Sequence, residues 1–189
     1  MTTILASASP RRRELLSLAG IAFEVHAPDV DERIDPAWTA AQAARALAEL
    51  KAAAVAESFP RTCVVAADTV VEIDGVLLGK PADAADAVRM LRLLSGREHR
   101  VVTGVCLRLG EARRVFSQET LVRFYPLGED EIEAYVRTGE PMDKAGAYGI
   151  QGRGALLVEG ITGDYFNVVG LPVARLVREL RDFTKECGV

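Results

Sequence analysis

The chain has 189 residues, of which 49% are hydrophobic, 26% are charged and 6% are aromatic, and its formal net charge is −4. The apolar half excludes a disordered chain, and the length suffices for one substantial core. Net acidity and few aromatics argue against a broad surface for nucleic acid or an anionic membrane. A small anionic ligand needs only a few cations in one place. We therefore expect a single domain over residues 1–189.

The termini and cysteines indicate a cytoplasmic protein. No apolar run approaches the ~20 residues of a membrane span, and the first residues lack the basic start and long apolar core of a signal peptide. Cys63, Cys106 and Cys187 form no CxxC pair and no cluster with histidine, so they support neither a disulfide framework nor a zinc site. We expect Cys63 and Cys106 in the core and Cys187 at the surface.

The first half of the chain predicts strands that alternate with helices. The expected elements are a strand at 4–6, a helix that Ser9 caps and Pro10 begins and that stops at Gly20, a strand at 21–25, a polar loop at 29–36, an Ala-rich helix at 39–58, and strands at 62–73 and 76–78 joined by an Asp74-Gly75 hairpin turn. This pattern is typical of an α/β domain.

The second half continues the alternation, with one glycine-rich interruption. The expected elements are a helix at 83–94, strands at 99–109 and 112–124, a helix at 129–137, a strand at 155–161 and a final helix from Pro172 that buries Ala174, Leu176, Val177 and Leu180. Residues 139–154 predict either an ordered functional loop or a disordered one, and Tyr148 and Ile150 favour burial. The whole chain predicts an α/β fold with a mixed, twisted sheet and flanking helices.

Three arginines, Arg11 to Arg13, stand in the first turn of the first predicted helix. Cations are unfavourable there, because the helix N-terminus already carries partial positive charge. An anion bound by backbone N–H groups, the hydroxyls of Ser7 and Ser9, and guanidinium groups would reverse this penalty. The alternative is that the arginines point into solvent and pair with the acidic loop. The spacing matches neither a P-loop nor a dinucleotide fingerprint.

Asp68 is the most unusual carboxylate, because it interrupts an apolar strand. Burial of a carboxylate is costly unless it is paired, hydrogen-bonded or bound to a metal. Asp68 is therefore either a metal ligand or general base, or a residue that only closes a strand or turn. Glu32 in the acidic loop is a natural second carboxylate, since magnesium or manganese on a nucleotide takes one or two carboxylates plus phosphate oxygens. Alone, Glu32 also fits a solvated loop.

Two lysines and one glutamine complete the candidate residues. Lys80 stands between Gly79 and Pro81 at a strand exit, whereas Lys51 lies among alanines on the long helix, where a solvated lysine is the ordinary alternative. Gln151, in the glycine-rich segment, can donate and accept hydrogen bonds at once, which suits the amide edge of a pyrimidine base.

With these residues assembled, the chain resembles the Maf family of nucleoside triphosphate pyrophosphatases over nearly its whole length. The motifs that carry the resemblance are Leu5-Ala6-Ser7 with Ser9-Pro10-Arg11-Arg12, Ala67-Asp68-Thr69, Gly79-Lys80-Pro81, Ser95-Gly96 with His99, Thr103-Gly104, Asp143-Lys144-Ala145-Gly146-Ala147-Tyr148-Gly149-Ile150-Gln151-Gly152 and Val168-Val169-Gly170-Leu171-Pro172. Several ordered motifs in one chain are far more specific than any single one.

The resemblance implies two lobes around a central cleft, and metal-dependent hydrolysis of a nucleoside triphosphate to the monophosphate and pyrophosphate. It implies Asp68 as proton acceptor and Glu32 as its metal partner for Mg, Mn or Co. The positions it implies for substrate binding are Ser7, Arg11, Arg12, Lys51, Thr69, Lys80 and Gln151. Arg11, Thr69 and Gln151 match the positions linked to substrate choice and resemble the branch that acts on dTTP and UTP. The family is also associated with homodimers and, in some bacteria, with inhibition of septum formation.

Two other classes of function remain as alternatives. A nucleotide-binding regulator of cell division would use the same cations without turnover, with Asp68 only holding a metal. An RNA-binding module would use Arg11 to Arg13 as its contact patch, but sparse aromatics and net acidity argue against it. Release of pyrophosphate separates an enzyme from both.

Overall fold

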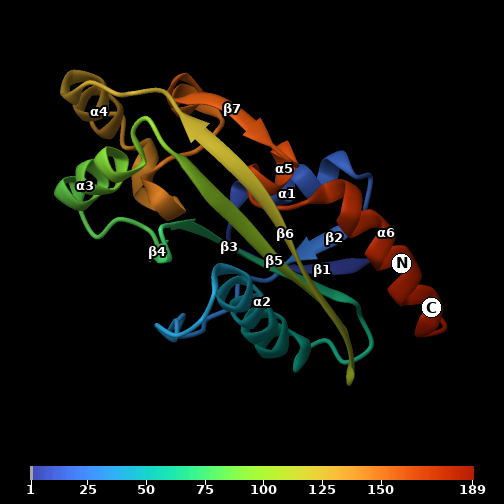
Figure 1. The fold of residues 1–189 in the computed structure, drawn as a ribbon. Coiled ribbons are helices and arrows are strands. Elements are labelled where there is room, and N and C mark those ends of the chain that lie inside the picture. Colours follow the sequence, from blue (N-terminus) through green and yellow to red (C-terminus); the bar gives the residue numbers. More distant parts are fainter. Residues whose placement is uncertain (1) are drawn as a thin grey trace.

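The structure is a computed structural model that describes residues 2–189. A seven-stranded mixed sheet runs through it, with helices packed on both faces (Figure 1). The strands are β1 (Thr3–Ala6), β2 (Phe23–Val25), β3 (Val64–Ile73), β4 (Val76–Leu78), β5 (Glu98–Leu109), β6 (Ala112–Phe124) and β7 (Val158–Thr162). The helices are α1 (Pro10–Leu18), α2 (Ala40–Ala56), α3 (Ala84–Leu94), α4 (Glu129–Val136), α5 (Tyr165–Val169) and α6 (Val173–Glu186), with 3₁₀ helices η1 (Glu140–Asp143), η2 (Ala145–Ala147) and η3 (Gly152–Leu157).

The sheet has the strand order β2-β1-β3-β5-β6-β7. Strand β1 pairs in parallel with β2 and β3, whereas β3, β5, β6 and β7 pair antiparallel in succession, and β4 folds back on the end of β3. This arrangement confirms the predicted α/β fold with a mixed sheet. Within residues 2–189, none of the helices combines the length and the apolar character that a membrane crossing requires.

Local signals in the sequence set several element boundaries. Ser9 is the N-cap of α1 and accepts from the backbone N–H of Arg12, with Pro10 at the first helical position, as predicted. Asp74 and Gly75 have φ values of 53° and 79°, which is the geometry that a two-residue hairpin requires. The hairpin between β3 and β4 is therefore also confirmed.

The C-terminal third departs from the prediction in three places. The stretch 155–157 continues the 3₁₀ helix η3, so β7 begins only at Val158. Helix α5, which Asp164 caps, was not predicted, because five residues are too few to show a helical period. In α6, Ala174 and Val177 face solvent, and the prediction of their burial was wrong. The buried face follows Val173, Leu176, Leu180 and Phe183 instead.

The glycine-rich segment 139–154 is ordered and consists mainly of the three short 3₁₀ helices. Tyr148 and Ile150 are buried, as predicted, and the Tyr148 hydroxyl lies 2.7 Å from Nε2 of the buried His99. Gly146 has a φ of 70°, and its N–H donates to the carbonyl of Gly79. These contacts fix the segment against the strands that border the site described below.

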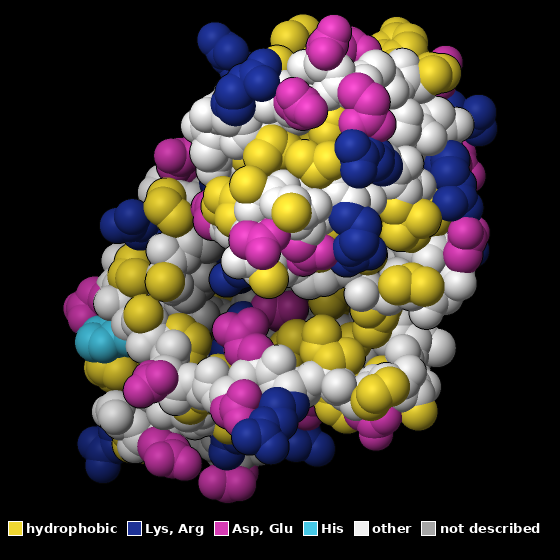
Figure 2. Space-filling model, turned by 90° about the vertical axis from the view of Figure 1, so that its left-hand side faces the viewer, with side chains coloured by type: hydrophobic (Ala, Val, Ile, Leu, Met, Phe, Trp, Pro, Cys, Tyr) yellow, Lys and Arg dark blue, Asp and Glu magenta, His cyan; other side chains and the backbone are white. Residues whose placement is uncertain are grey.

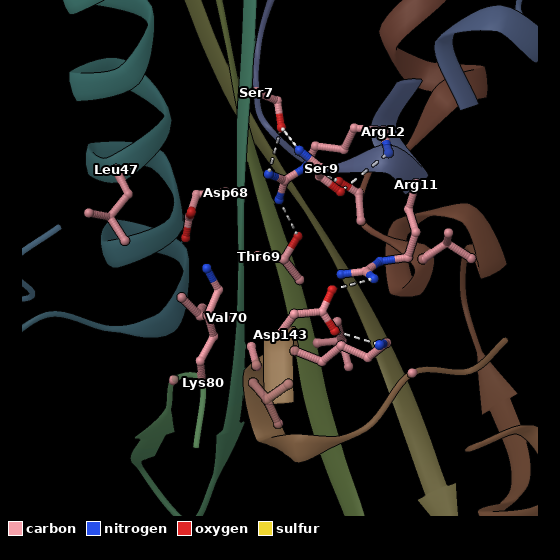
Figure 3. A pocket seen from close by; sticks show the side chains of 18 of the residues that line it. Ser7, Ser9, Arg11, Arg12, Leu47, Asp68, Thr69, Val70, Lys80 and Asp143 are labelled. Atoms are coloured by element: carbon pink, nitrogen blue, oxygen red, sulfur yellow. Dashed lines mark hydrogen bonds and ion pairs between the residues drawn. The ribbon is translucent and has the colours of Figure 1, made fainter. Parts of the chain in front are cut away.

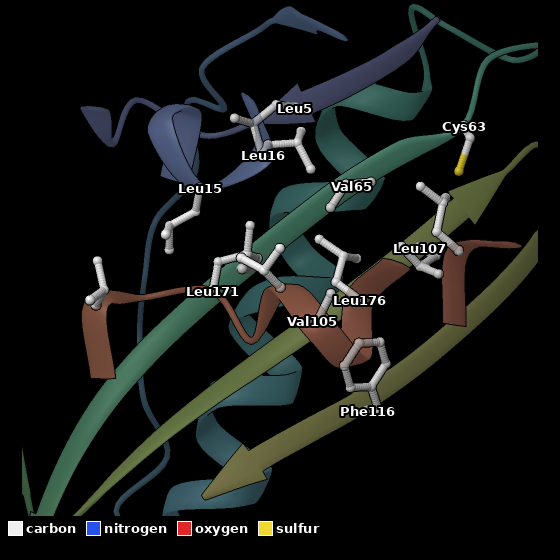
Figure 4. Close-up of a cluster of buried hydrophobic side chains, with 14 of the residues drawn as sticks. Leu5, Leu15, Leu16, Cys63, Val65, Val105, Leu107, Phe116, Leu171 and Leu176 are labelled. Carbon is white, nitrogen blue, oxygen red and sulfur yellow. The ribbon is translucent and has the colours of Figure 1, made fainter. Parts of the chain in front are cut away.

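The two faces of the sheet are covered by different helices, because alternate residues of each strand point in opposite directions. On one face, Val65 and Ala67 of β3 pack with residues of α1 and α6 (Figure 4). On the other, Val64 and Ala66 pack against the alanine face of α2. Cys63 and Cys106 are buried, which confirms that prediction, while Cys187 is partly buried and packs against the first cluster.

Strand β3 has a gap in its pairing that decides where a ligand could enter. Its pairing with β1 ends at Ala66, and its pairing with β4 starts at Val71, so no described strand covers this edge of β3 in between. On the opposite edge, β5 pairs throughout, and Gly104 of β5 lets α2 come close. A Cβ on Gly104 would overlap the carbonyl oxygen of Ala44. Helix α2 is thus held directly against the sheet beside the gap.

Candidate active site

A cleft of about 510 Å³ opens at the uncovered edge of β3. Its lining comes from the loop after β1, the start of α1, the face of α2, the exit of β4 and the segments around η1 and α5. A hollow between an upper and a lower part of the molecule is visible in the space-filling view, and acidic, basic and apolar side chains meet in it (Figure 2). The volume lies within the range of small-molecule sites.

The start of α1 contributes the two arginines that line the cleft. Helix α1 has no acidic residue in its first turn, and Arg11 and Arg12 are half-buried in the cleft while Arg13 is exposed. Ser7 is buried beside them, and its Oγ accepts from the N–H of Ser9. Hydroxyls, positive side chains and the positive end of a helix therefore point at one place, which favours an anion.

Arg12 is held in place by three groups from different parts of the chain. Its Nε donates to the carbonyl of Gly170 at 2.9 Å, and its Nη2 donates to Oγ1 of Thr69 at 3.0 Å. Its Nη1 reaches Oγ of Ser7 at 3.5 Å (Figure 3). Burial lowers the pKa of Arg12, and the nearby Asp68 carboxylate opposes that shift. The guanidinium is thus a fixed, partly desolvated cation in the wall of the cleft.

Arg11 forms an ion pair across the cleft with Asp143 of η1, at 3.0 Å. Asp143 also accepts from Nζ of Lys144 at 2.6 Å. Partial burial opposes ionisation of Asp143, but the hydrogen bonds from Lys144 and Arg11 outweigh it and lower the pKa of Asp143. Arg11 thus pairs with a residue that follows it by 132 positions and not with the acidic loop 29–36, which the sequence alone allows as an alternative.

Lys51 is the centre of a triad with two carboxylates. Its ammonium lies 2.5 Å from Oδ1 of Asp68 on β3 and 2.9 Å from Oε1 of Glu32 in the loop between β2 and α2. Lys51 is only 7% exposed, so the alternative of a solvated helical lysine is wrong. A buried ammonium is costly without partners, and the two carboxylates satisfy it. Glu32 and Asp68 therefore converge on one point, which the Lys51 ammonium occupies.

Consecutive residues of β3 point to opposite sides of the strand. Asp68 faces α2 and Thr69 faces Arg12, and the side chain of Lys80 extends toward Asp68 from beyond the end of β4 (Figure 3). Because the strand edge between them is uncovered, one ligand lying over this edge can touch both sides. Alternation along the strand places Asp68 and Thr69 on opposite faces of the sheet, and the uncovered edge exposes both side chains to the same cleft.

All of the predicted site residues except Gln151 line this cleft: Ser7, Arg11, Arg12, Glu32, Lys51, Asp68, Thr69 and Lys80. Gln151 is exposed and is not part of the lining. The backbone is extended at Tyr148 and at Gln151, and the inward positions of this stretch are taken by Tyr148 and Ile150. The role of Gln151 in base recognition stays a prediction.

Three contributors to the site had no role assigned from the sequence. Asp143, the carbonyl of Gly170 and the hydroxyl of Thr103 all contact or support the arginines and Thr69. Each lies in one of the motifs quoted above, so the signal was present. Its meaning was not accessible, because these contacts join segments that are far apart in sequence.

Comparisons with known proteins place this geometry in a family. A family model described as Maf-like protein matches residues 2–183. The chain belongs to the Maf family. A relative from Symbiobacterium thermophilum named dTTP/UTP pyrophosphatase is 55% identical over 180 residues, which cover 95% of this chain and 93% of that protein. Relatives of the same name from Bacillus cytotoxicus and a Geobacillus species are 54% and 52% identical, covering 95% and 94% of this chain and 94% and 96% of theirs.

A solved structure, that of the Staphylococcus aureus Ham1 protein, aligns with this Maf family member at a TM-score of 0.46 and 17% identity, over 66% of this chain and 72% of that one. This similarity is too low to support an inference.

Proposed function

We propose that this Maf family protein hydrolyses nucleoside triphosphates, with dTTP and UTP favoured, to the monophosphate and pyrophosphate. The observation that carries the proposal is the meeting of Arg11, Arg12 and Lys80 with Asp68 in one cleft at the uncovered edge of β3. Relatives about half identical to this chain are named for this activity. Modified pyrimidine nucleotides are further candidate substrates.

The proposed chemistry is in-line attack of water on the α-phosphorus. A bond forms between the water oxygen and the α-phosphorus, the bond from that phosphorus to the bridging oxygen breaks, and pyrophosphate leaves. Asp68 accepts the proton of the water, and the Lys51 ammonium on Oδ1 orients the carboxylate so that Oδ2 can receive it. Arg11, Arg12 and Lys80 neutralise the triphosphate, and most of the rate comes from this positioning and charge neutralisation.

A divalent cation, Mg, Mn or Co, belongs to the same proposal. Glu32 and Asp68 would hold it through carboxylate oxygens that do not contact Lys51, since the Lys51 ammonium contacts Oε1 of Glu32 and Oδ1 of Asp68. Within residues 2–189, no group of three or more His, Cys, Asp or Glu side chains could hold a metal. The two carboxylates near one another are enough for an ion that completes its shell with substrate phosphates and water. When bound, such an ion supplies charge neutralisation and a more acidic water.

The deciding experiment is a screen for pyrophosphate release. The protein is incubated with dTTP, UTP, dCTP, dATP, dGTP and modified pyrimidine nucleotides, with Mg²⁺, Mn²⁺ or Co²⁺, and pyrophosphate and monophosphate are measured together. We expect release with dTTP and UTP well above the other nucleotides. Nucleotide binding without pyrophosphate release would instead support the regulator of cell division, for which no contact in the structure provides separate support.

Assembly and surroundings complete the proposal. We propose a cytoplasmic homodimer that acts on small nucleotides and binds neither nucleic acid nor membranes. The net charge of −4 supports the absence of a polyanion surface, and the family resemblance supports the dimer. Light scattering coupled to size-exclusion chromatography measures the molar mass and so tests the dimer. RNA binding at several salt concentrations tests the proposal that the protein does not bind nucleic acid. Tight, steeply salt-dependent RNA binding would contradict it.

A further inference from the structure

A chain of hydrogen bonds leads from the cleft into the protein interior. Nη2 of Arg12 donates to Oγ1 of Thr69 at 3.0 Å, and Oγ1 of Thr69 lies 2.9 Å from Oγ1 of Thr103. Oγ1 of Thr103 in turn donates to the carbonyl of Asn167 at 3.0 Å. Thr103 and Asn167 are both fully buried. Neither of them lines the cleft.

The direction of these hydrogen bonds follows from the number of protons available. A threonine hydroxyl has one hydrogen, and Thr103 gives its hydrogen to the Asn167 carbonyl. The hydrogen between the two hydroxyls must therefore come from Thr69. Oγ1 of Thr69 then has only lone pairs left on the cleft side. One of them accepts a hydrogen bond from Nη2 of Arg12, because a guanidinium can only donate.

Asn167 is itself fixed by contacts on several sides. Its Nδ2 donates to the carbonyl of Val101 and to Oγ1 of Thr120, each at 3.0 Å. Its backbone N–H donates to the carboxylate of Asp164, which caps α5. The carbonyl that ends the chain of hydrogen bonds is thus a rigid acceptor, and Gly170, three residues further on, supplies the carbonyl that receives Nε of Arg12. Helix α5 therefore controls Arg12 at two points.

We infer that Thr103 and Asn167 are positioning residues for Arg12, and that they act by holding Thr69 as a hydrogen-bond acceptor. Without the Thr103 hydroxyl, the hydrogen of Thr69 has no inward partner and turns toward the cleft, where it meets the donor-only guanidinium. Arg12 then loses one of its two shorter hydrogen bonds and its fixed orientation. The inference rests on the proposed function in one respect, namely that Arg12 binds the triphosphate.

The test compares Thr103→Val, which removes the hydroxyl at nearly constant volume, with Thr103→Ser, which keeps it. Two quantities are measured: the kcat and KM of pyrophosphate release from dTTP, and the Kd of tripolyphosphate by calorimetry. We expect Thr103→Val to raise KM and Kd roughly 10-fold, with a smaller change in kcat, since it weakens a hydrogen bond to a charged group. Thr103→Ser should restore both values to within about 2-fold.

The control is Thr3→Val, because Thr3 is a similarly buried threonine of the same sheet that does not line the cleft. It should leave KM, Kd and kcat within about 2-fold of wild type. Thermal unfolding is recorded for every variant, and Thr103→Ala against Thr103→Ser replaces the first pair if Thr103→Val does not fold. A large effect of Thr3→Val equal to that of Thr103→Val would overturn the inference, because any buried threonine would then do the same.

A double-mutant cycle decides whether Thr103 acts through Arg12. In an Arg12→Lys background, Thr103→Val should change Kd by less than about 2-fold, because the group that it positions is absent. A full 10-fold effect in that background would refute the positioning role. If the wild-type protein binds tripolyphosphate but releases no pyrophosphate, the proposed hydrolysis fails while the Kd values still judge this inference. If it binds no triphosphate at all, both fail.

Discussion

The two sides of β3 in the cleft are built on different principles. On the side that faces α2, Asp68 belongs to a triad of full charges with Lys51 and Glu32. On the other side, Thr69 belongs to a chain of neutral hydroxyls and carbonyls that ends on a single cation, Arg12. The charged groups can take new partners when an ion or a phosphate arrives, whereas Thr69, whose hydrogen goes to Thr103, presents only lone pairs to the cleft. The first side is suited to chemistry and the second to orientation.

The largest effect should come from Asp68→Asn, which breaks the charged side alone. Removing a general base costs on the order of 10²–10⁴ in rate, so kcat for dTTP should fall by that factor. The fold and the affinity for tripolyphosphate should change little, because an amide oxygen can still accept from Lys51, the Lys51 ammonium keeps Glu32 as its ion-pair partner, and Arg12 is untouched. Asp130→Asn, at an exposed position on α4, is the matched control. Turnover near the wild-type rate in Asp68→Asn would rule out the role of Asp68 as base.

Lys51→Met should lower the free energy of unfolding and make that free energy depend on the concentration of Mg²⁺. Removing one partner of a buried ion pair costs about 3 kcal/mol, because Asp68 and Glu32 then repel each other without their shared cation. Mg²⁺ should raise the unfolding midpoint of this variant more than that of the wild type, since the vacated position suits a cation. Lys185→Met, at an exposed position on α6, is the control. An equal Mg²⁺ response in both proteins would contradict the proposed convergence of the carboxylates.

The buried His99, which does not itself line the cleft, predicts a loss of stability in acid. Burial lowers the pKa of His99 from 6.5 to about 4. Between these values the unfolded chain binds a proton that the folded protein does not, so stability falls as pH drops from 6.5 to 4. The loss is at most about 3 kcal/mol. Denaturant unfolding at several pH values measures it.

His99→Gln should flatten this pH dependence, whatever it does to stability at neutral pH. His26→Gln is the control, because the side chain of the only other histidine is 42% exposed. An unchanged slope between pH 4 and 6.5 in His99→Gln would mean that other groups cause the acid sensitivity.

The smallest effect should come from Asp143→Asn, which frees Arg11 from its ion pair across the cleft. Exposed ion pairs contribute between 0 and 1 kcal/mol, so the KM for dTTP should fall by a factor of up to about 5. Raising the salt concentration should reduce the difference in KM between the variant and the wild type, because salt screens the ion pair. Asp182→Asn, whose partner Arg181 lies outside the cleft, should show no such change. A higher KM in Asp143→Asn would indicate that Asp143 supports binding and does not compete with it.

Local signals in the sequence were sufficient for much of the fold. The Ser9 cap, the Asp74-Gly75 turn and the alanine-rich helix each depend on neighbouring residues, and the structure has all three. The exposed Ala174 and Val177 show the limit, because the rotation of α6 is set by what it packs against and not by its own composition.

For the site, most of the residues predicted from the sequence line the cleft, but the sequence did not show how they connect. Lys51 had an ordinary alternative in solvent, since its partners come from a loop before α2 and a strand after it. Thr103 lies in one of the motifs, but the sequence does not show what its hydroxyl contacts, and Asn167 gave no chemical signal, because amides inside apolar segments are common. Their proposed role depends on the hydroxyl hydrogen of Thr103, which is donated to the Asn167 carbonyl, and only the folded structure shows this contact.

The uncovered stretch of β3 also bears on solubility. A sheet edge with free backbone groups is a template on which a strand of another molecule can pair, and proteins commonly block such edges with charge. Here the blocking groups are Arg12, Asp68 and Lys80, which line the same cleft. A variant that loses these charges should therefore leave an edge open to self-association, in addition to any effect on the proposed turnover.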